Sequence, residues 1–180
     1  MKKWKLLKET DASPAKWYPI VKRDYELPNG KVLDYYTAKL NNSVFVLPIV
    51  KGECIFVKQF RPGSQTTEIQ VMAGYVENEE EVEKSARREL LEETGMTFKT
   101  FLPLGSHYRS PANNIQKIYT FLACDFEKQE EQILEETEFI EVVKIPVKKV
   151  VKMLKNDEFN CADTKNTILM AYLKYPEKFK

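Results

Sequence analysis

The stretch from residue 74 to residue 96 constrains the fold of this chain more than any other part of the sequence. Within it, Val82, Ala86 and Leu90 recur at i, i+4 and i+8, which is the spacing of the buried face of a helix. We therefore predict a helix over residues 79–94 whose apolar stripe packs on a sheet.

The two ends of this helix are marked by residues that suit them. Asn78 stands just before it as a candidate N-cap, and Gly95 stands just after it, where a residue of positive φ commonly ends a helix. Gly74 closes the apolar segment that precedes the helix. Both glycines are therefore expected where the backbone turns sharply.

Three carboxylates share one face of the predicted helix. Glu89, Glu92 and Glu93 stand at i, i+3 and i+4, so their side chains can converge on one point. Like charges on an exposed helix repel by roughly a few tenths of a kcal/mol per pair, so a cation should lie nearby. Arg88 can pair with Glu92, but a hard divalent ion, Mg²⁺ or Mn²⁺, suits such a cluster best. On charge alone, a solvated surface helix remains an open alternative.

The remaining pattern predicts a single globule of mixed α and β structure. The chain has 180 residues, of which 43% are hydrophobic, which is enough for a sizeable core. A hairpin is expected around the turn Pro28-Asn29-Gly30. The other expected strands are 44–47, 54–57, 118–126 and 139–145; the other expected helices are 147–155 and 164–175; and 127–138 is expected as a mobile acidic loop.

The charge and cysteine content narrow the classes of partner. Lys and Arg number 28 against 27 Asp and Glu, so a net charge of +1 gives no general attraction to nucleic acid or to an anionic membrane. The longest apolar run, residues 44–50, is too short to span a bilayer. Cys54, Cys124 and Cys161 are isolated, which favours reduced thiols and a cytoplasmic location.

The stretch 74–96 resembles the Nudix box, G-x5-E-x7-R-E-U-x-E-E-x-G-U, where U is an aliphatic residue. No fixed position is missed; the matching residues are Gly74, Glu80, Arg88, Glu89, Leu90, Glu92, Glu93, Gly95 and Met96. The resemblance implies an α/β/α sandwich with a mixed sheet, of the α+β kind, over residues 43–180. An N-terminal β-hairpin region, residues 1–42, would precede it.

The same resemblance implies roles for the residues of the box. Glu89 and Glu93 would bind Mg²⁺ or Mn²⁺, with Glu92 as a further ligand or helper and the carbonyl of Ala73 completing the site. Arg88 would orient the glutamates, so that Glu92, Glu93 and Arg88 form the catalytic set. Gly74, Glu80 and Gly95 would be structural members of the motif.

Beyond the box, the chain resembles the ADP-ribose pyrophosphatase-like branch of this family. The marks are the leading hairpin with Leu27-Pro28-Asn29-Gly30, Gln59-Phe60-Arg61, Ser110-Pro111 and the tail at 161–165. They imply hydrolysis of ADP-ribose to AMP and ribose 5-phosphate by a homodimer that residues 1–42 help to form. The implied substrate-binding residues are Arg61, Gln70, Ser110, Pro111, Gln116 and Trp17.

Two amides depart from the pattern of that branch. Gln70 and Gln116 stand where it often has glutamate, and an amide cannot accept a proton at neutral pH. A glutamate of the acidic loop, such as Glu127, Glu130 or Glu131, could serve as the base instead. Water activated by the metal ions could also suffice, or catalysis could be weak with a different substrate preference.

Other readings of the sequence stay open. The box says nothing of the base or sugar, so another nucleotide sugar, such as a GDP-hexose, is an alternative substrate. A weakly active sensor that binds a nucleotide sugar is a second alternative. The lone histidine, His107, is interpreted as a structural hydrogen-bonding residue.

Overall fold

The computed structural model describes residues 2–180, which divide into two compact units. The first unit contains the chain up to Asn42 together with His107–Lys117. The second unit contains Ser43–Ser106 and Ile118–Lys180. A segment between two long strands thus belongs with the N-terminal region, although it lies some 65 residues further along the chain.

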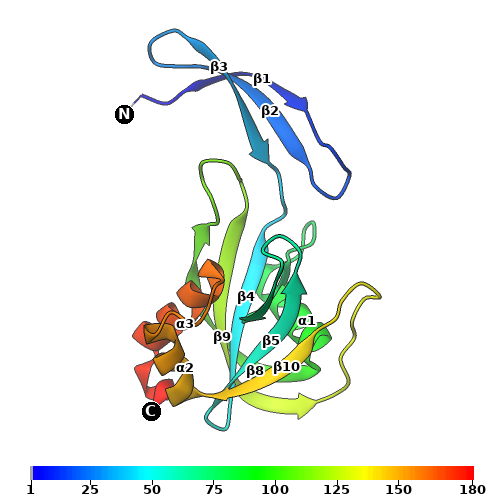
Figure 1. The fold of residues 1–180 in the computed structure, drawn as a ribbon, viewed down its shortest axis with the longest axis vertical. Helices are drawn as coiled ribbons and strands as arrows, with labels where there is room; N and C mark the ends of the chain where they lie inside the picture. Colours follow the sequence, from blue (N-terminus) through cyan, green and yellow to red (C-terminus); the bar gives the residue numbers. More distant parts are fainter. Residues whose placement is uncertain (1) are drawn as a thin grey trace. The chain divides into compact units, whose positions relative to one another are not determined.

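The first unit is built on a three-stranded antiparallel sheet in the order β1-β2-β3 (Figure 1). Its strands are β1 (Lys5–Asp11), β2 (Ile20–Glu26) and β3 (Val32–Ala38). The predicted hairpin is confirmed: Leu27 N–H donates to the carbonyl of Lys31 at 2.8 Å, and Gly30 takes a positive φ of 81°. The strand β1 was not predicted, because all of its residues are exposed and no alternation of apolar and polar residues marks it.

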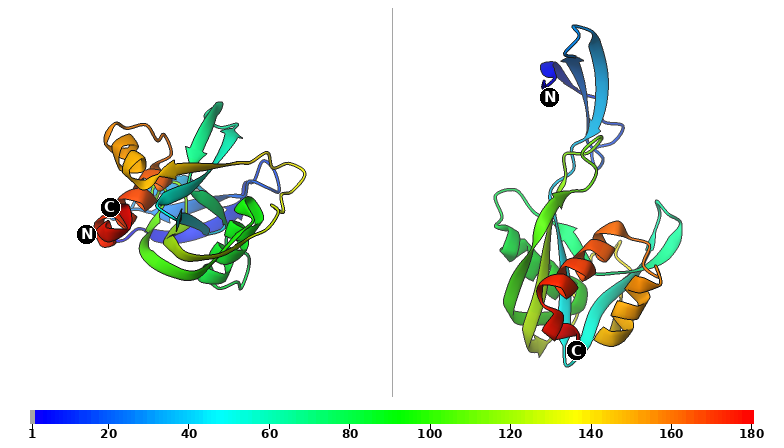
Figure 2. Two further views of the ribbon diagram at one scale, coloured as in Figure 1. Left: turned by 90° about the horizontal axis from the view of Figure 1, so that it is seen from below. Right: turned by 90° about the vertical axis from the view of Figure 1, so that its left-hand side faces the viewer.

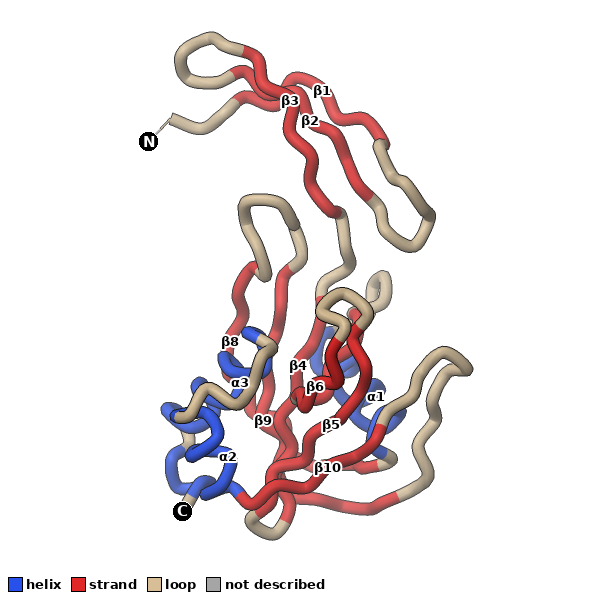
Figure 3. The backbone as a smooth tube through the Cα atoms, in the orientation of Figure 1, coloured by secondary structure: helices blue, strands red, loops and turns tan. Residues whose placement is uncertain are grey.

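The second unit contains a seven-stranded mixed sheet (Figure 3). The order is β10-β5-β4-β9-β8, with β6 paired to β5 and β7 paired to β4. The pair β4–β9 is parallel, whereas β4–β5, β4–β7, β5–β6 and β5–β10 are antiparallel. The strands are β4 (Ser43–Val50), β5 (Glu53–Arg61), β6 (Thr66–Gln70), β7 (Met72–Tyr75), β8 (Met96–Tyr108), β9 (Lys117–Gln129) and β10 (Glu141–Pro146).

Helices cover both faces of this sheet, as Figure 2 shows. Val44 and Val46 of β4 belong to the apolar cluster that includes residues of α1 (Val82–Thr94). Phe45 and Leu47 belong to a second cluster, with residues of α2 (Val147–Lys155) and α3 (Ala162–Lys174). Because successive strand residues point to opposite faces, the continuous apolar run of β4 seats helices on both sides.

The predicted helices are present, with three changed boundaries. The helix α2 has the predicted bounds, whereas α3 begins two residues before its predicted start and ends one residue before its predicted end. The helix α1 begins at Val82 rather than at residue 79, because Glu79 has a left-handed φ of 65° and cannot continue into a helix. Asn78 is therefore not its N-cap, and Glu81 holds that position.

The end of α1 is as predicted. Gly95 takes φ of 69°, and its N–H donates to the carbonyl of Leu91 at 2.7 Å. Ala86 and Leu90 are buried against the sheet, which confirms the predicted stripe. A short 3-10 turn, η1 (Pro176–Phe179), follows α3.

The longest unpredicted strand is β8, which starts directly after Gly95. Its buried residues, Met96, Phe98, Phe101 and Leu104, are spaced two, three and three apart. The alternation that identifies a strand is therefore broken inside it.

The three cysteines are free, as expected, with Cys54 and Cys124 buried and Cys161 partly exposed. Burial raises the pKa of the Cys54 thiol to about 12. In the part of the chain that the structure describes, no helix has the length and apolar character needed to cross a membrane.

Candidate active site

Two carboxylates of α1 lie against the backbone of β7. The side chain of Glu93 is buried, and its Oε2 accepts the N–H of Ala73 at 3.3 Å. The carboxylate of Glu89 fills the space beside the Cα of Gly74, where a Cβ would stand 1.8 Å from Glu89 Cδ. A side chain at residue 74 and the observed position of Glu89 therefore exclude each other.

Arg88 holds the neighbouring carboxylates of the same helix. Its Nη1 donates to Glu89 Oε1 at 2.9 Å and to Glu92 Oε2 at 3.0 Å. Its Nε and Nη2 donate to the two oxygens of Glu80 at 3.2 and 3.0 Å, and Nη2 also donates to the carbonyl of Tyr75. The guanidinium thus links the turn before α1, the end of β7 and two glutamates of the cluster.

Glu80 is fixed from two sides. It accepts the fork of Arg88 and also the hydroxyl of Ser85, at 2.6 Å. These bonds stabilise the ionised form and lower the pKa of Glu80 to about 2. The turn before α1 is therefore tied to the helix by an ionised carboxylate.

The charges inside the cluster are only partly balanced. Burial, reinforced by the negative charge of Glu89, raises the pKa of Glu93 to about 8. Burial also raises the pKa of Glu89. The positive charge of Arg61 lowers the pKa of Glu93 and so opposes part of this shift. Arg61 Nε also donates a hydrogen bond to Gln70 Oε1 at 2.7 Å. The structure thus brings Arg61 and Gln70 to the same cluster.

A divalent cation fits this set of side chains chemically. Glu89 and Glu93 offer hard oxygen donors, and the raised pKa of each shows that its ionised form lacks sufficient nearby positive charge, which Mg²⁺ or Mn²⁺ would supply. Within residues 2–180, the structure contains no group of three or more Asp, Glu, His or Cys side chains arranged to hold one metal ion. Glu89 and Glu92 bond to Arg88 instead.

One carboxylate of this site was not singled out from the sequence. Glu138, on the loop between β9 and β10, lies close enough to Glu89 and Glu93 for its charge to raise the pKa of both. Of the glutamates that the sequence suggested in this segment, Glu130 pairs with Lys128 at 2.6 Å and Glu127 lies exposed in β9. No periodic pattern marks a loop residue, so proximity to the helix could be found only from the fold.

The remaining predicted substrate residues lie in the first unit. Gln116 is fully buried, accepts from Arg109 Nη1 at 3.2 Å and donates to the carbonyl of Asn41 at 2.7 Å. Ser110, which precedes the exposed Pro111, bonds through its hydroxyl to Asn113. Trp17 is 82% exposed. Contact of these residues with a substrate stays a prediction.

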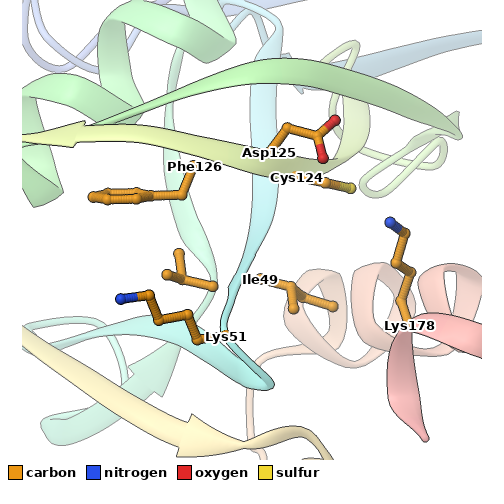
Figure 4. A pocket seen from close by; sticks show the side chains of 7 residues that line it. Ile49, Lys51, Cys124, Asp125, Phe126 and Lys178 are labelled. Carbon is orange, nitrogen blue, oxygen red and sulfur yellow. The ribbon is translucent and has the colours of Figure 1, made fainter.

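A separate pocket of about 350 Å³ opens in the second unit (Figure 4). None of its lining residues belongs to the predicted site; they are Ile49, Val50, Lys51, Cys124, Asp125, Phe126 and Lys178. The pocket and the carboxylate cluster therefore share no residue.

The contact at Gly74 gives a first prediction. Gly74→Ala should displace the carboxylate of Glu89 while changing the free energy of unfolding by less than about 1 kcal/mol, because the end of a glutamate side chain can rotate away. The Mg²⁺-dependent hydrolysis that the resemblance to the Nudix family implies should fall by at least about tenfold. The control is Gly63→Ala, where a Cβ meets nothing within 4 Å. Equal rates in the two variants would contradict the role given to this contact.

The lowered pKa of Glu80 gives a second prediction. Because its folded pKa lies below the ordinary value of 4.5, the stabilisation is present above pH 4.5 and is lost as the pH falls toward 2. Glu80→Gln should therefore cost about 1–2 kcal/mol at pH 7, and the difference from the wild type should shrink below pH 4.5. Urea unfolding across pH measures it. Glu83→Gln, which breaks an exposed pair with Arg87, should cost less than about 0.5 kcal/mol. A pH-independent effect of Glu80→Gln would refute the assignment.

The chain is similar in sequence to several known proteins. An ADP-ribose pyrophosphatase of Bacillus subtilis (strain 168) is 36% identical over 156 residues, covering 86% of this chain and 83% of that protein. A methanol dehydrogenase activator of Bacillus methanolicus is 28% identical, covering 87% and 85%. A GDP-mannose pyrophosphatase of Escherichia coli O1:K1 / APEC is also 28% identical, covering 83% and 75%.

The fold prediction is confirmed by a solved structure. The crystal structure of an ADP compounds hydrolase matches 99% of this chain and 97% of its own with a TM-score of 0.88, at 21% sequence identity. The NUDIX domain family matches residues 39–163, which include the whole cluster around α1. The chain therefore belongs to the NUDIX family.

Proposed function

We propose that this protein hydrolyses the pyrophosphate bond of a nucleoside diphosphate sugar, with ADP-ribose as the first candidate and AMP and ribose 5-phosphate as products. The observation that carries the proposal is the convergence of the Glu89 and Glu93 carboxylates on the backbone of Ala73 and Gly74. Its support from relatives is the 36% identity to an ADP-ribose pyrophosphatase.

The metal in this proposal is Mg²⁺ or Mn²⁺. Glu89 and Glu93 would hold it, with the carbonyl of Ala73 and with Glu92 as a further ligand or helper. When bound, such an ion neutralises charge on the pyrophosphate and activates water. Arg88 would keep Glu89 and Glu92 oriented through its two bonds from Nη1.

Arg61 would bind the oxygens of the phosphate groups. One N–H of its fork is used by Gln70, and the others can donate to a phosphate in a bidentate manner. Because Gln70 is neutral, this bond leaves the positive charge of Arg61 uncancelled. A glutamine here therefore suits binding of an anion beside Glu93.

Glu138 would remove the proton from the attacking water. The water oxygen forms a bond to one phosphorus, the bond from that phosphorus to the bridging oxygen breaks, and the proton passes to the Glu138 carboxylate. The position of Glu138 near Glu89 and Glu93 supports this role over one for Glu127, Glu130 or Glu131.

The test of the function is release of nucleoside monophosphate. Purified protein is incubated with Mg²⁺ and ADP-ribose, GDP-mannose, other nucleotide sugars and dinucleotides. The proposal expects AMP from ADP-ribose, and no release after Glu93→Gln. Faster hydrolysis of GDP-mannose would favour the alternative substrate, a GDP-hexose. The 28% identity to a GDP-mannose pyrophosphatase is the reason to include this compound. Tight binding of one compound without release of nucleoside monophosphate would contradict the enzyme proposal and favour a sensor that binds a nucleotide sugar.

The role of Glu138 gives a third prediction. Glu138→Gln should lower kcat by about 100-fold with little change in KM, since the amide cannot accept a proton. The control is Glu136→Gln, an exposed carboxylate two residues earlier in the same loop. Full kcat in Glu138→Gln would remove this residue from the mechanism.

We also propose a cytoplasmic homodimer that forms through the first unit. Its support is a row of large apolar side chains left exposed there, including Trp4, Leu6 and Leu33. Leu6 and Leu33 lie on one face of the sheet, since both pair with Tyr25. Trp4 packs its ring 5.8 Å from that of Tyr25.

A fourth prediction tests the dimer. Leu33→Lys should convert the protein to a monomer in light scattering, because a charge would enter the apolar face. Val32→Lys, at an exposed position on the opposite face of the same strand and across from Glu26, is the control. A wild-type monomer at micromolar concentration would contradict the proposal.

A further inference from the structure

The start of the loop after β9 closes the C-terminal end of α1. The last carbonyls of a helix have no partner within it and must be satisfied from outside. Here four consecutive ones, from Glu92 to Gly95, accept hydrogen bonds from a single short segment, 129–133. The donors are Ile133 N–H to Glu92 at 2.9 Å, Gln132 Nε2 to Glu93, Gln129 Nε2 to Thr94 at 2.9 Å and Glu130 N–H to Gly95 at 2.7 Å.

Gly95 allows this contact as well as the end of the helix. A Cβ at this position would stand 2.2 Å from the carbonyl oxygen of Glu130 and 2.9 Å from Gln129 Nε2. The backbone of the loop therefore lies directly on the glycine. Residues 127–129, expected as the start of a mobile acidic loop, belong to β9, and residues 129–133 are hydrogen-bonded to the end of α1.

The same loop carries Glu138. The N–H of Glu135 donates to Glu138 Oε2 at 3.0 Å, and the N–H of Glu138 donates to the carbonyl of Glu135 at 2.9 Å. This turn follows the segment bound to α1 by two residues. Residues 132 and 133 thus bind the backbone of Glu92 and Glu93. Glu138, a few residues later in the same loop, places a carboxylate near Glu93.

We infer that Gln132 is a positioning residue, because its side-chain amide holds the carbonyl of Glu93 and so fixes the loop of Glu138 relative to the carboxylates of α1. Only a donor can fill this place, since its partner is a carbonyl. A cationic donor would also suit it, because positive charge is favourable at a helix C-terminus. The claim that this affects catalysis rests on the proposed function, whereas the hold on the loop does not.

The experiment compares three variants with the wild type. Gln132→Glu keeps the size of the side chain and removes the donor; Gln132→Lys restores a donor; and Gln65→Glu makes the first change at an exposed turn. Two quantities are measured: amide hydrogen exchange at Glu130 and Ile133 in the metal-free protein, and kcat and KM for ADP-ribose with Mg²⁺. Thermal unfolding establishes that each variant is folded at the assay temperature.

The three variants should differ in a specific pattern. Gln132→Glu should exchange both amides about tenfold faster and lose about tenfold in kcat, with KM changed by less than about threefold, as for other residues that orient a catalytic group. Gln132→Lys should recover most of both losses, and Gln65→Glu should match the wild type.

Two results would contradict the role given to Gln132. Unchanged exchange in Gln132→Glu would show that Gln132 does not hold the loop. Faster exchange with wild-type kcat would show that the hold has no part in catalysis. If the wild type hydrolyses no nucleotide sugar, the proposed function fails separately, and the exchange measurement alone still decides whether Gln132 holds the loop.

Discussion

The structure of the site depends on one unfavourable arrangement, the burial of two carboxyl groups beside each other. Glu93 is only 5% exposed and Glu89 lies next to it against Gly74. Burying an ionised carboxylate is costly unless it is bonded or paired, and here burial and mutual repulsion both raise the pKa of Glu93. The rest of the unit supplies what this arrangement requires: a rigid helix, a backbone without a side chain at residue 74, and nearby cations.

Each end of α1 is held by a different set of contacts. At the start, Glu80 and Arg88 join the preceding turn to the helix by an ion pair in which the carboxylate is 10% exposed. At the end, residues 129–133 donate hydrogen bonds to the carbonyls from Glu92 to Gly95, which have no partner within the helix. Between them, Ala86 and Leu90 pack into the core beneath the helix. A helix fixed at both ends and along one face keeps carboxylates in place that would otherwise move apart.

Much of this was predictable from the sequence, because it depends on local spacing. The stripe of Val82, Ala86 and Leu90, the glycine at the end of the helix and the shared face of Glu89, Glu92 and Glu93 are all properties of a 3.6-residue period. The hairpin around Gly30 and the buried strand at residues 44–47 followed from turn chemistry and apolar runs. The start of α1 did not, because the left-handed φ of Glu79 has no clear mark in the sequence.

Features that depend on distant contacts could not be predicted. Glu138 lies 45 residues after Glu93 in the chain, and Gln129 and Gln132 lie 35 and 39 residues after the carbonyls that they bond. The strand β8 was missed because its buried residues follow no fixed spacing, and β1 because it buries none.

We propose that a divalent cation binds between α1 and the end of β7. Titration with Mn²⁺, followed by paramagnetic broadening of amide resonances, tests this directly. At low Mn²⁺ the resonances of Ala73, Gly74, Glu89 and Glu93 should broaden first, and Glu93→Gln should abolish the effect. Broadening that begins elsewhere, such as around Asp125 in the separate pocket, or that persists in Glu93→Gln, would contradict the account.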